Sequence, residues 1–418
     1  MLSKEENELL TRTGAGTPMG DLFRRYWIPA LLSEEIPEPD CPPVQVRLMG
    51  EELVAFRDSE GRVGLLDEHC HHRGTSLFYG RNEECGLRCV YHGWKYDVDG
   101  NVVDTPAEPA GSRFKEKLHH TAYPTREAAG VVFAYMGPPD RMPLFPAYEF
   151  TTAPAGSTQA TKTLQECNYL QGVEGECDTT HLQYLHWQFE ATGHMRDYYR
   201  NPMREYVTEE TDFGMRLVAL RDAGPGRTYV RVSSIVMPML CWIPAGGTGS
   251  VHMYVPAGDD EHSWRFNLDL NVGERNRLMQ EQFWTADYHK VRNKANHYLQ
   301  DRELQRTVNF TGMGSNFVIH DSCATETMGP IYDRSREHLG ASDRAVIAVR
   351  NYLLRTVRAC ANGAEPPNLI ADAGHDQHGH IDTFSRVIDG TDWRAAFPHL
   401  TLTRDAAVAG AGLARAPR

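Results

Sequence analysis

Two short cysteine–histidine pairs constrain this chain more than any other feature of its sequence. The first pair is Cys70-x-His72, and the second, Cys89-x-x-His92, follows after sixteen intervening residues. Thiolates and imidazoles are the side chains that bind zinc and iron–sulfur clusters in proteins. The spacing therefore predicts two loop tips that converge on one metal centre.

The order of the four side chains distinguishes two kinds of metal centre. Zinc-binding loops usually present two cysteines together and then two histidines together. Here each pair has one of each, which suits a Rieske 2Fe-2S cluster, in which the two cysteines hold one iron and the two histidines hold the other. Arg73-Gly74 and Gly93-Trp94 follow the two pairs and favour tight turns with a packed aromatic ring beneath the cluster. We therefore expect the iron–sulfur cluster, with zinc as the alternative.

Two further candidate ligands stand in the same stretch. His71 is adjacent to His72, and one loop tip cannot easily point adjacent side chains at one centre, so we interpret His71 as a surface or supporting imidazole. Cys85 falls in the middle of the connecting loop and is interpreted as a bystander. The odd total of nine cysteines also argues against a disulfide framework.

Length and charge exclude several classes of protein. A chain of 418 residues is too long for one ordinary hydrophobic core and predicts two domains. A net charge of −13 would repel a phosphate backbone, which argues against nucleic-acid binding. The longest apolar run, residues 235–245, is broken by two prolines and is shorter than the roughly 20 residues of a membrane span. The first residues are charged and lack the apolar core of a signal peptide, so we expect a soluble, cytoplasmic protein.

The sequence divides into four segments. Residues 1–41 indicate two short helices that pack on the second domain. Residues 42–147 carry short alternating runs separated by Gly, Asp and Asn, which is typical of a small antiparallel β domain. Residues 148–400 place strands and helices in separate blocks and predict an α+β domain, and residues 401–418 read as a frayed tail. Within the second domain we expect a helical stretch at 163–190, strands at 204–209, 214–221, 228–237, 251–256 and 263–271, and helices at 273–307 and 343–361.

A second set of candidate ligands lies in the stretch NYLQGVEGECDTTHLQYLH. It contains Asp178-x-x-His181-x4-His186, and two imidazoles near a carboxylate suggest a site for mononuclear Fe(II), although packed core residues would look the same. On a regular α-helix, positions 181 and 186 lie about 140° apart and cannot share one face. We therefore predict a π-bulge or a helix end between the two histidines.

With both motifs, the chain resembles the catalytic subunits of Rieske non-haem iron oxygenases over most of its length. The resemblance is closest to the group of phthalate dioxygenase and the aryl-ether O-demethylases, through NYLQ, EGECD-x2-H-x4-H and TETMGPIYDRSREHLGASD. Thr75 and Tyr91 stand where respiratory Rieske proteins have a disulfide-forming cysteine pair, which indicates the oxygenase or ferredoxin branch. The resemblance implies an α+β protein, with an N-terminal all-β Rieske domain and a C-terminal helix-grip catalytic domain, an antiparallel sheet with helices.

The resemblance also implies roles for individual residues. Asp178 would not bind iron but would bridge a cluster histidine of a neighbouring subunit to a histidine of the mononuclear site, conveying the electron. The third iron ligand would then be Asp321 in FVIHDSCATETMGP, with His320 and Glu326 as rivals and helix capping as its alternative role. The implied cofactors are a 2Fe-2S cluster on Cys70, His72, Cys89 and His92, and Fe(II) on His181, His186 and Asp321.

The activity implied is that of a terminal oxygenase component, assembled as a cyclic trimer or as two stacked trimers. A separate flavin- or ferredoxin-type reductase would supply electrons, because the sequence has no nucleotide-binding fingerprint of its own. We expect an aromatic substrate, carboxylated or methoxylated, and Arg204 or Arg231 as the residue that would bind a carboxylate, unless these arginines face solvent. Ring hydroxylation, dihydroxylation and O-demethylation all stay open. A Rieske electron-transfer protein without oxygenase chemistry and a zinc-stabilised binding module are the alternatives from other classes.

Overall fold

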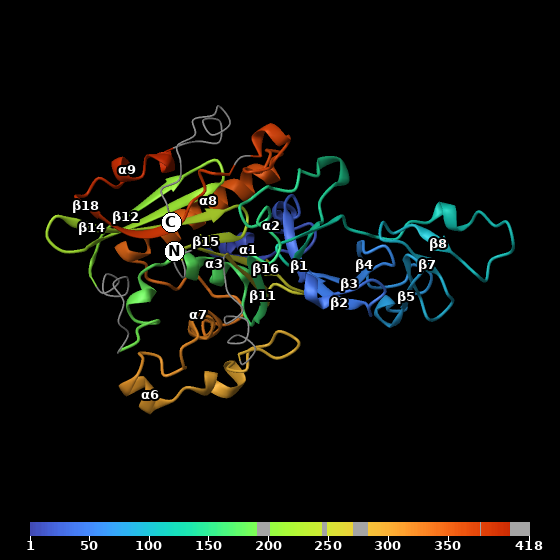
Figure 1. Ribbon diagram of the computed structural model, residues 1–418, viewed down its shortest axis with the longest axis horizontal. Helices are drawn as coiled ribbons and strands as arrows, with labels where there is room; N and C mark the ends of the chain where they lie inside the picture. The colour runs from blue at the N-terminus through green and yellow to red at the C-terminus, as the bar shows by residue number, and fades with distance from the viewer. Residues whose placement is uncertain (190–200, 245–248, 271–282, 377, 402–418) are drawn as a thin grey trace.

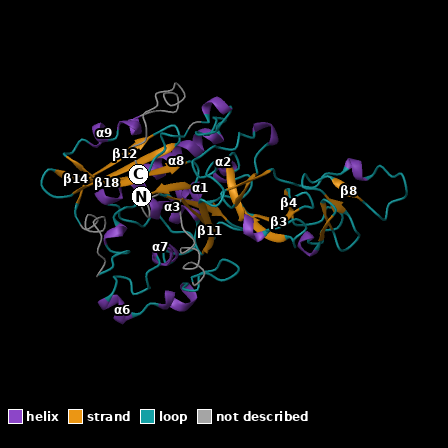
Figure 2. Ribbon diagram, viewed as in Figure 1, coloured by secondary structure: helices purple, strands orange, loops and turns teal. Residues whose placement is uncertain are grey.

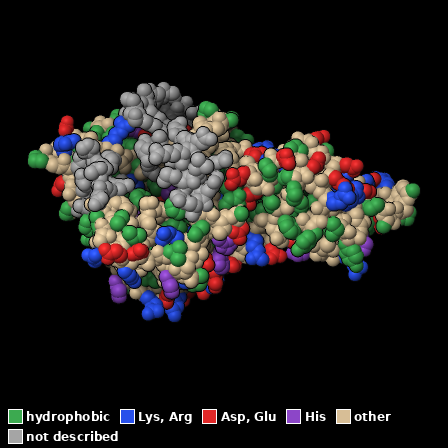
Figure 3. Space-filling view, turned by 60° about the horizontal axis from the view of Figure 1, so that its bottom comes forward, with side chains coloured by type: hydrophobic (Ala, Val, Ile, Leu, Met, Phe, Trp, Pro, Cys, Tyr) green, Lys and Arg blue, Asp and Glu red, His purple; other side chains and the backbone are tan. Residues whose placement is uncertain are grey.

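The computed structural model describes residues 1–189, 201–244, 249–270, 283–376 and 378–401. These residues form a wide body from which a narrower arm projects (Figure 1). The same projection is visible in the space-filling view, with hydrophobic side chains exposed along it (Figure 3). Within the described part of the chain, no helix has the length and apolar character needed to cross a bilayer.

The arm is built from two small antiparallel sheets, as the alternating sequence pattern predicted. One sheet has the order β2-β3-β4 and the other the order β5-β6-β7-β8. Their inner faces pack around a common apolar cluster that includes Phe56, Leu77 and Trp94. The strands are β2 Val44–Leu48, β3 Glu51–Arg57, β4 Val63–Asp67, β5 Arg81–Glu83, β6 Gly86–Arg88, β7 Lys95–Tyr96 and β8 Val102–Asp104.

The N-terminal segment begins with the two short helices that the sequence predicted, α1 (Lys4–Thr11) and α2 (Pro18–Phe23). Ser3 caps α1 by accepting a hydrogen bond from the backbone N–H of Glu6. The chain then forms a strand that the sequence did not reveal. This strand, β1, joins a third sheet of order β1-β10-β9, formed by Trp27–Leu32, Val131–Tyr135 and Thr125–Ala128.

The body contains one large antiparallel sheet, with helices packed beside it (Figure 2). Its order is β11-β17-β16-β15-β14-β13-β12, and β18 also pairs with β14. The five strands expected from the sequence are confirmed, and β11, β15 and β18 were not expected. The strands are β11 Thr158–Gln165, β12 Met203–Glu210, β13 Gly214–Asp222, β14 Arg227–Val236, β15 Leu240–Ile243, β16 Ser250–Pro256, β17 Ser263–Leu270 and β18 Phe384–Asp389.

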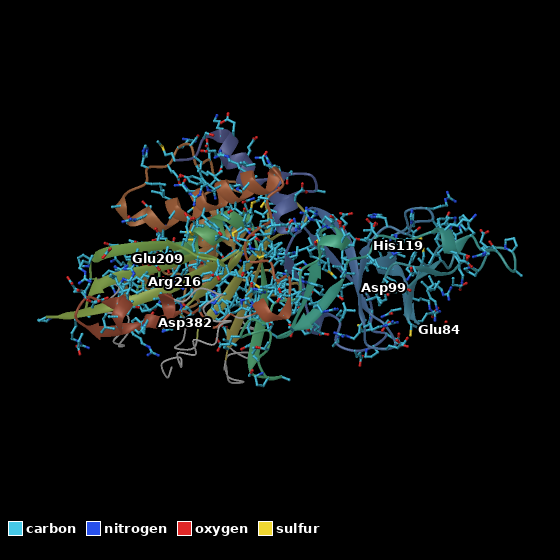
Figure 4. The ribbon with its side chains drawn as sticks, turned by 90° about the horizontal axis from the view of Figure 1, so that it is seen from above. Glu84, Asp99, His119, Glu209, Arg216 and Asp382 are labelled. Atoms are coloured by element: carbon cyan, nitrogen blue, oxygen red, sulfur yellow. The ribbon has the colours of Figure 1, made fainter. Side chains whose placement is uncertain are left out.

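The two faces of this sheet are covered by different segments. Helix α8 (Arg344–Ala361), predicted at 343–361, packs against β12 and β13 on one face, together with α1 to α3. The C-terminal segment covers the opposite face, where Arg216 and Asp382 lie, and it includes the short helix α9 (Trp393–Ala396) (Figure 4). Arg216 contacts Glu209 on the neighbouring strand, and Asp382 accepts a hydrogen bond from His399 at 3.0 Å. These contacts hold the end of the described chain against the sheet.

The helix predicted over residues 163–190 is wrong in extent. Residues 158–165 form the edge strand β11, because their alternating threonines favour an extended chain. The helix that follows, α3 (Tyr169–Cys177), begins at the capping residue Asn168 and ends before Asp178. Beyond it the structure has only a short 3-10 turn, His181–Gln183.

The helix predicted over residues 273–307 is also wrong where the structure describes it. Residues 271–282 lie outside the described part of the chain. Downstream there are a 3-10 segment, Lys294–Leu299, and one short helix, α6 (Arg302–Thr307). His297 and Tyr298 adopt φ angles of 53° and 54°, a conformation that no α-helix allows. The next helix is α7 (Phe317–Glu326).

A buried ion-pair network fixes α3 in the body. Glu174 accepts hydrogen bonds from Nε of Arg334 at 2.7 Å and from Nε of Arg350 at 2.6 Å. Burial by itself would raise the pKa of Glu174, but the two guanidinium groups outweigh it and lower the pKa. The helix turn that leads into Asp178 is therefore anchored by charge as well as by packing.

We expect the substitution Glu174→Ala to destabilise the body by roughly 3–5 kcal/mol, because it leaves two buried arginines without their carboxylate. Urea unfolding followed by circular dichroism measures this loss. Glu303→Ala is the matched control, since it breaks an exposed ion pair with Arg306 and should cost less than about 1 kcal/mol. Equal losses in the two variants would contradict an anchoring role for Glu174.

Candidate metal centres

The two loops at the arm have the same backbone geometry. In the first, the N–H of Gly74 donates to the carbonyl of Cys70 at 2.8 Å, and in the second, the N–H of Gly93 donates to the carbonyl of Cys89 at 3.0 Å. The two glycines have φ angles of +74° and +75°, a conformation that residues with a side chain rarely adopt. Each turn therefore requires its glycine four residues after the cysteine.

These turns bring the four candidate ligands together as two like pairs. Both cysteines are buried and close enough for their thiols to interact, and burial raises the pKa of Cys89. The rings of His72 and His92 lie 4.5 Å apart. Trp94 stacks on His72 at 4.5 Å, which is the packed aromatic ring that the sequence predicted.

The paired arrangement suits two metal ions better than one. A single zinc ion needs four donor atoms close together. In the described part of the chain, the sets of His, Cys, Asp or Glu whose donor atoms lie within 4.8 Å of one another do not include these four residues. Nδ1 of His72 is buried and, within the described residues, has no hydrogen-bond partner, as a nitrogen reserved for a metal would be. The residues therefore fit a 2Fe-2S cluster.

The two other candidate ligands of this stretch lie elsewhere. His71 is exposed, and its ring lies 5.9 Å from that of His120. Cys85 is half-buried at a turn with a φ of 58°, beside Asp58 and Glu60.

The second centre forms where α3 ends. Asp178 caps the helix with extended backbone and accepts a hydrogen bond from the N–H of Thr180 at 2.6 Å. The chain then enters the 3-10 turn that contains His181, and His186 follows the end of that turn. The helix end expected between the two histidines is thus present, and it allows both rings to face the same point.

Asp321 reaches that point from α7. Nε2 of His186 lies 3.0 Å from Oδ1 of Asp321, and Nε2 of His181 lies 3.9 Å from the same oxygen. Donor atoms roughly 3 Å apart are what metal bonds of about 2.1 Å at right angles require. Two imidazoles and one carboxylate are a donor set for mononuclear Fe(II), so these three residues fit that ion.

The charges around this donor set are balanced by partners. Burial would raise the pKa of Asp321, but His186, Arg265 and His181 together hold it well below its usual range. Burial would lower the pKa of His181, but the carboxylates of Asp178 and Asp321 raise it overall. Nδ1 of His181 faces Oδ2 of Asp178 at 3.8 Å. The arrangement keeps the carboxylate ionised and ready to bind a cation.

The rivals for the third ligand have other partners. Glu326 forms an ion pair with Lys290 at 2.6 Å and accepts a hydrogen bond from Tyr298. His320 lies behind His186, with Nε2 facing the carbonyl of Gly314 at 3.0 Å, and burial lowers its pKa to about 4. Neither belongs to the set of donors formed by His181, His186 and Asp321.

The two candidate substrate residues differ in exposure. Arg204 is exposed on the edge strand β12 and contacts Oγ1 of Thr228. Arg231 is buried on β14, and its Nη1 donates to the carbonyl of Pro244 at 3.2 Å. The charge of Arg231 influences Tyr206, which also senses Asp178. Arg231 therefore lies on the face of the sheet that carries the second centre.

Sequence reasoning missed two arginines at this centre. Arg265 on β17 is buried, and its Nη1 lies 3.4 Å from Oδ2 of Asp321. Arg221 on β13 is buried, and its Nη2 donates to the carbonyl of Thr179, beside Asp178, at 3.3 Å. A charged residue that alternates with apolar ones on a central strand was the available signal for both.

The fold and the two donor sets define a Rieske iron–sulfur protein with a second, mononuclear metal site, and comparison with known proteins agrees. Residues 26–124 match the model of the Rieske 2Fe-2S domain, and residues 134–406 match the model described as LigXa C-terminal domain like. The chain is 40% identical to the phthalate 4,5-dioxygenase oxygenase subunit of Pseudomonas putida, with 94% of each chain covered. It is 36% identical to the 3-chlorobenzoate-3,4-dioxygenase oxygenase subunit of Comamonas testosteroni, with 95% of this chain and 98% of that one covered.

Solved structures agree on the fold. The oxygenase in a reduced complex with ferredoxin, from carbazole 1,9a-dioxygenase, aligns with a TM-score of 0.55 at 19% identity, covering 88% of this chain and 99% of that chain. The chain belongs to the Rieske non-haem iron oxygenases, as an oxygenase subunit of the group that contains phthalate dioxygenase. It is accordingly an oxidoreductase with a 2Fe-2S cluster and a mononuclear iron site.

We expect about three irons per chain in the purified protein, two in the cluster and one in the body. His186→Ala should lose about one iron and keep the visible absorbance of the cluster, whereas Cys89→Ser should lose that absorbance. Iron analysis with visible spectroscopy measures both. His71→Ala is the control and should keep all the iron, and a loss of cluster absorbance in this variant would show that the ligands are misassigned.

Proposed function

We propose that this oxygenase dihydroxylates the ring of an aromatic carboxylate, with Arg231 as the residue that binds the carboxylate. The observation that carries the proposal is a buried guanidinium on the same face of the sheet as the donor set of His181, His186 and Asp321. The two relatives named above are oxygenase subunits of a phthalate dioxygenase and a chlorobenzoate dioxygenase, and both of these substrates are aromatic carboxylates.

The residues of the body would divide the work among them. When bound, the cluster supplies single electrons and the mononuclear iron supplies the activation of O2. His181, His186 and Asp321 would hold that iron and leave open positions on it. Arg221 would keep the turn of Asp178 in place through its contact with the carbonyl of Thr179. Burial of this pocket would exclude water and strengthen the attraction between Arg231 and a carboxylate.

Electrons would come from a separate reductase or ferredoxin that docks at the arm. The imidazoles of His72 and His92 are partly exposed there, and exposed Tyr79, Val90 and Tyr91 provide apolar contact area. The arm points away from the part of the body that contains α3 and α7 (Figure 1). This separation supports transfer from the cluster of one copy, through Asp178, to the iron site of another copy in a trimer or a stacked hexamer.

We expect Asp178→Asn to keep the cluster and the mononuclear iron but to lower turnover by at least about 100-fold. The asparagine retains the oxygen that accepts from Thr180, so the turn should fold as before. The negative charge that orients the ring of His181 is lost. Iron analysis combined with coupled product formation tests this prediction, and normal coupled activity in the variant would exclude Asp178 from the electron route.

Product identification with labelled O2, a surrogate reductase and a panel of aromatic acids and methoxylated aromatics tests the proposed reaction. We expect both oxygen atoms of O2 in a ring diol formed from a carboxylated substrate. Arg231→Met should lower kcat/KM for that substrate by at least roughly 30-fold, since a buried charge pair is worth about 2–5 kcal/mol.

Arg204→Met is the control for this measurement, because the Arg204 side chain is exposed, and its kcat/KM should stay near that of the wild type. Release of formaldehyde from a methoxylated compound as the main reaction would instead identify an O-demethylase. An equal effect of the two arginine variants would remove Arg231 as the carboxylate-binding residue.

A further inference from the structure

A second histidine lies directly behind one of the candidate iron ligands. Nδ1 of His186 is 3.3 Å from Nδ1 of His320, and the two rings are nearly parallel, at 21°. The ring of Phe317 stacks on the ring of His186 at 4.3 Å. His320 is fully buried and His186 nearly so.

The hydrogen-bond partners of the two rings fix which nitrogen carries each proton. The carbonyl of Gly314, 3.0 Å from Nε2 of His320, can only accept a hydrogen bond, so Nε2 of His320 carries a proton. Nδ1 of the neutral His320 ring is then an acceptor, and Nδ1 of His186 must be the donor. The other nitrogen of His186, Nε2, faces Asp321 and is left with its lone pair directed at the metal position.

We propose that His320 is a positioning residue for the mononuclear iron, because it holds the His186 ring in the tautomer and orientation that bind metal. The proposal rests on the assignment of His186 as an iron ligand. Ligating histidines usually donate their second N–H to a carboxylate, a backbone carbonyl or water. Here a neutral imidazole, itself anchored to the carbonyl of Gly314, takes that place and adds no charge next to Asp321.

The experiment measures Co(II) binding to protein that retains its cluster but has been depleted of the mononuclear iron. His320→Leu removes the acceptor and should weaken Co(II) binding by about 10- to 100-fold. His320→Asn places an amide oxygen near the former position of Nδ1, and its Co(II) affinity should stay within about threefold of the wild type. His380→Leu is the matched control, since His380 is equally buried but pairs with Asp212 on the other side of the sheet. Visible absorbance of the cluster and thermal unfolding report whether each variant is folded.

The outcomes separate this proposal from the proposed function. Failure of the wild type to bind one Co(II) would overturn the ligand assignment and the positioning role together. Binding by the wild type and equally tight binding by His320→Leu would overturn the positioning role alone. A loss in His320→Asn as large as that in His320→Leu, or an equal loss in His380→Leu, would also overturn it, because the effect would then not follow the acceptor at Nδ1.

Discussion

The end of α3 at Asp178 is the constraint on which the mononuclear site depends. A continuous helix would direct His181 and His186 to different sides, and Asp321 could then meet only one of them. The helix instead ends at a residue whose own carboxylate binds the following turn, and the 3-10 turn brings both rings toward α7. Glu174 holds the last turn of the helix with two arginines, so the position of the break is set by buried charge.

Outer contacts then determine how each ligand is presented. Asp321 has one oxygen toward the histidines and the other toward Arg265. His181 faces Asp178 with the nitrogen that is turned away from Asp321, and His186 faces His320 in the same way. Each donor is therefore held on two sides before a metal binds, which lowers the reorganisation that binding requires.

The sequence allowed the cluster loops and the break after Cys177 to be predicted, because both depend on residues that are close together in the chain. The glycines after Cys70 and Cys89 and the angle between positions 181 and 186 are local properties. The contact of Arg265 with Asp321 and the pairing of β1 with β10 join residues far apart, and no local pattern encodes them. The helix expected at 163–190 failed because pairing of β11 with β17 outweighed helix propensity.

The central claim is that electrons pass between copies of the chain to an iron site formed by His181, His186 and Asp321. Mixing two inactive variants tests it most directly: Cys89→Ser, which cannot form the cluster, and Asp321→Ala, which cannot complete the iron site. After dissociation and reassembly together, the account predicts that product formation returns, because mixed assemblies pair an intact cluster with an intact iron site. Assemblies that contain both chains but remain inactive would contradict it.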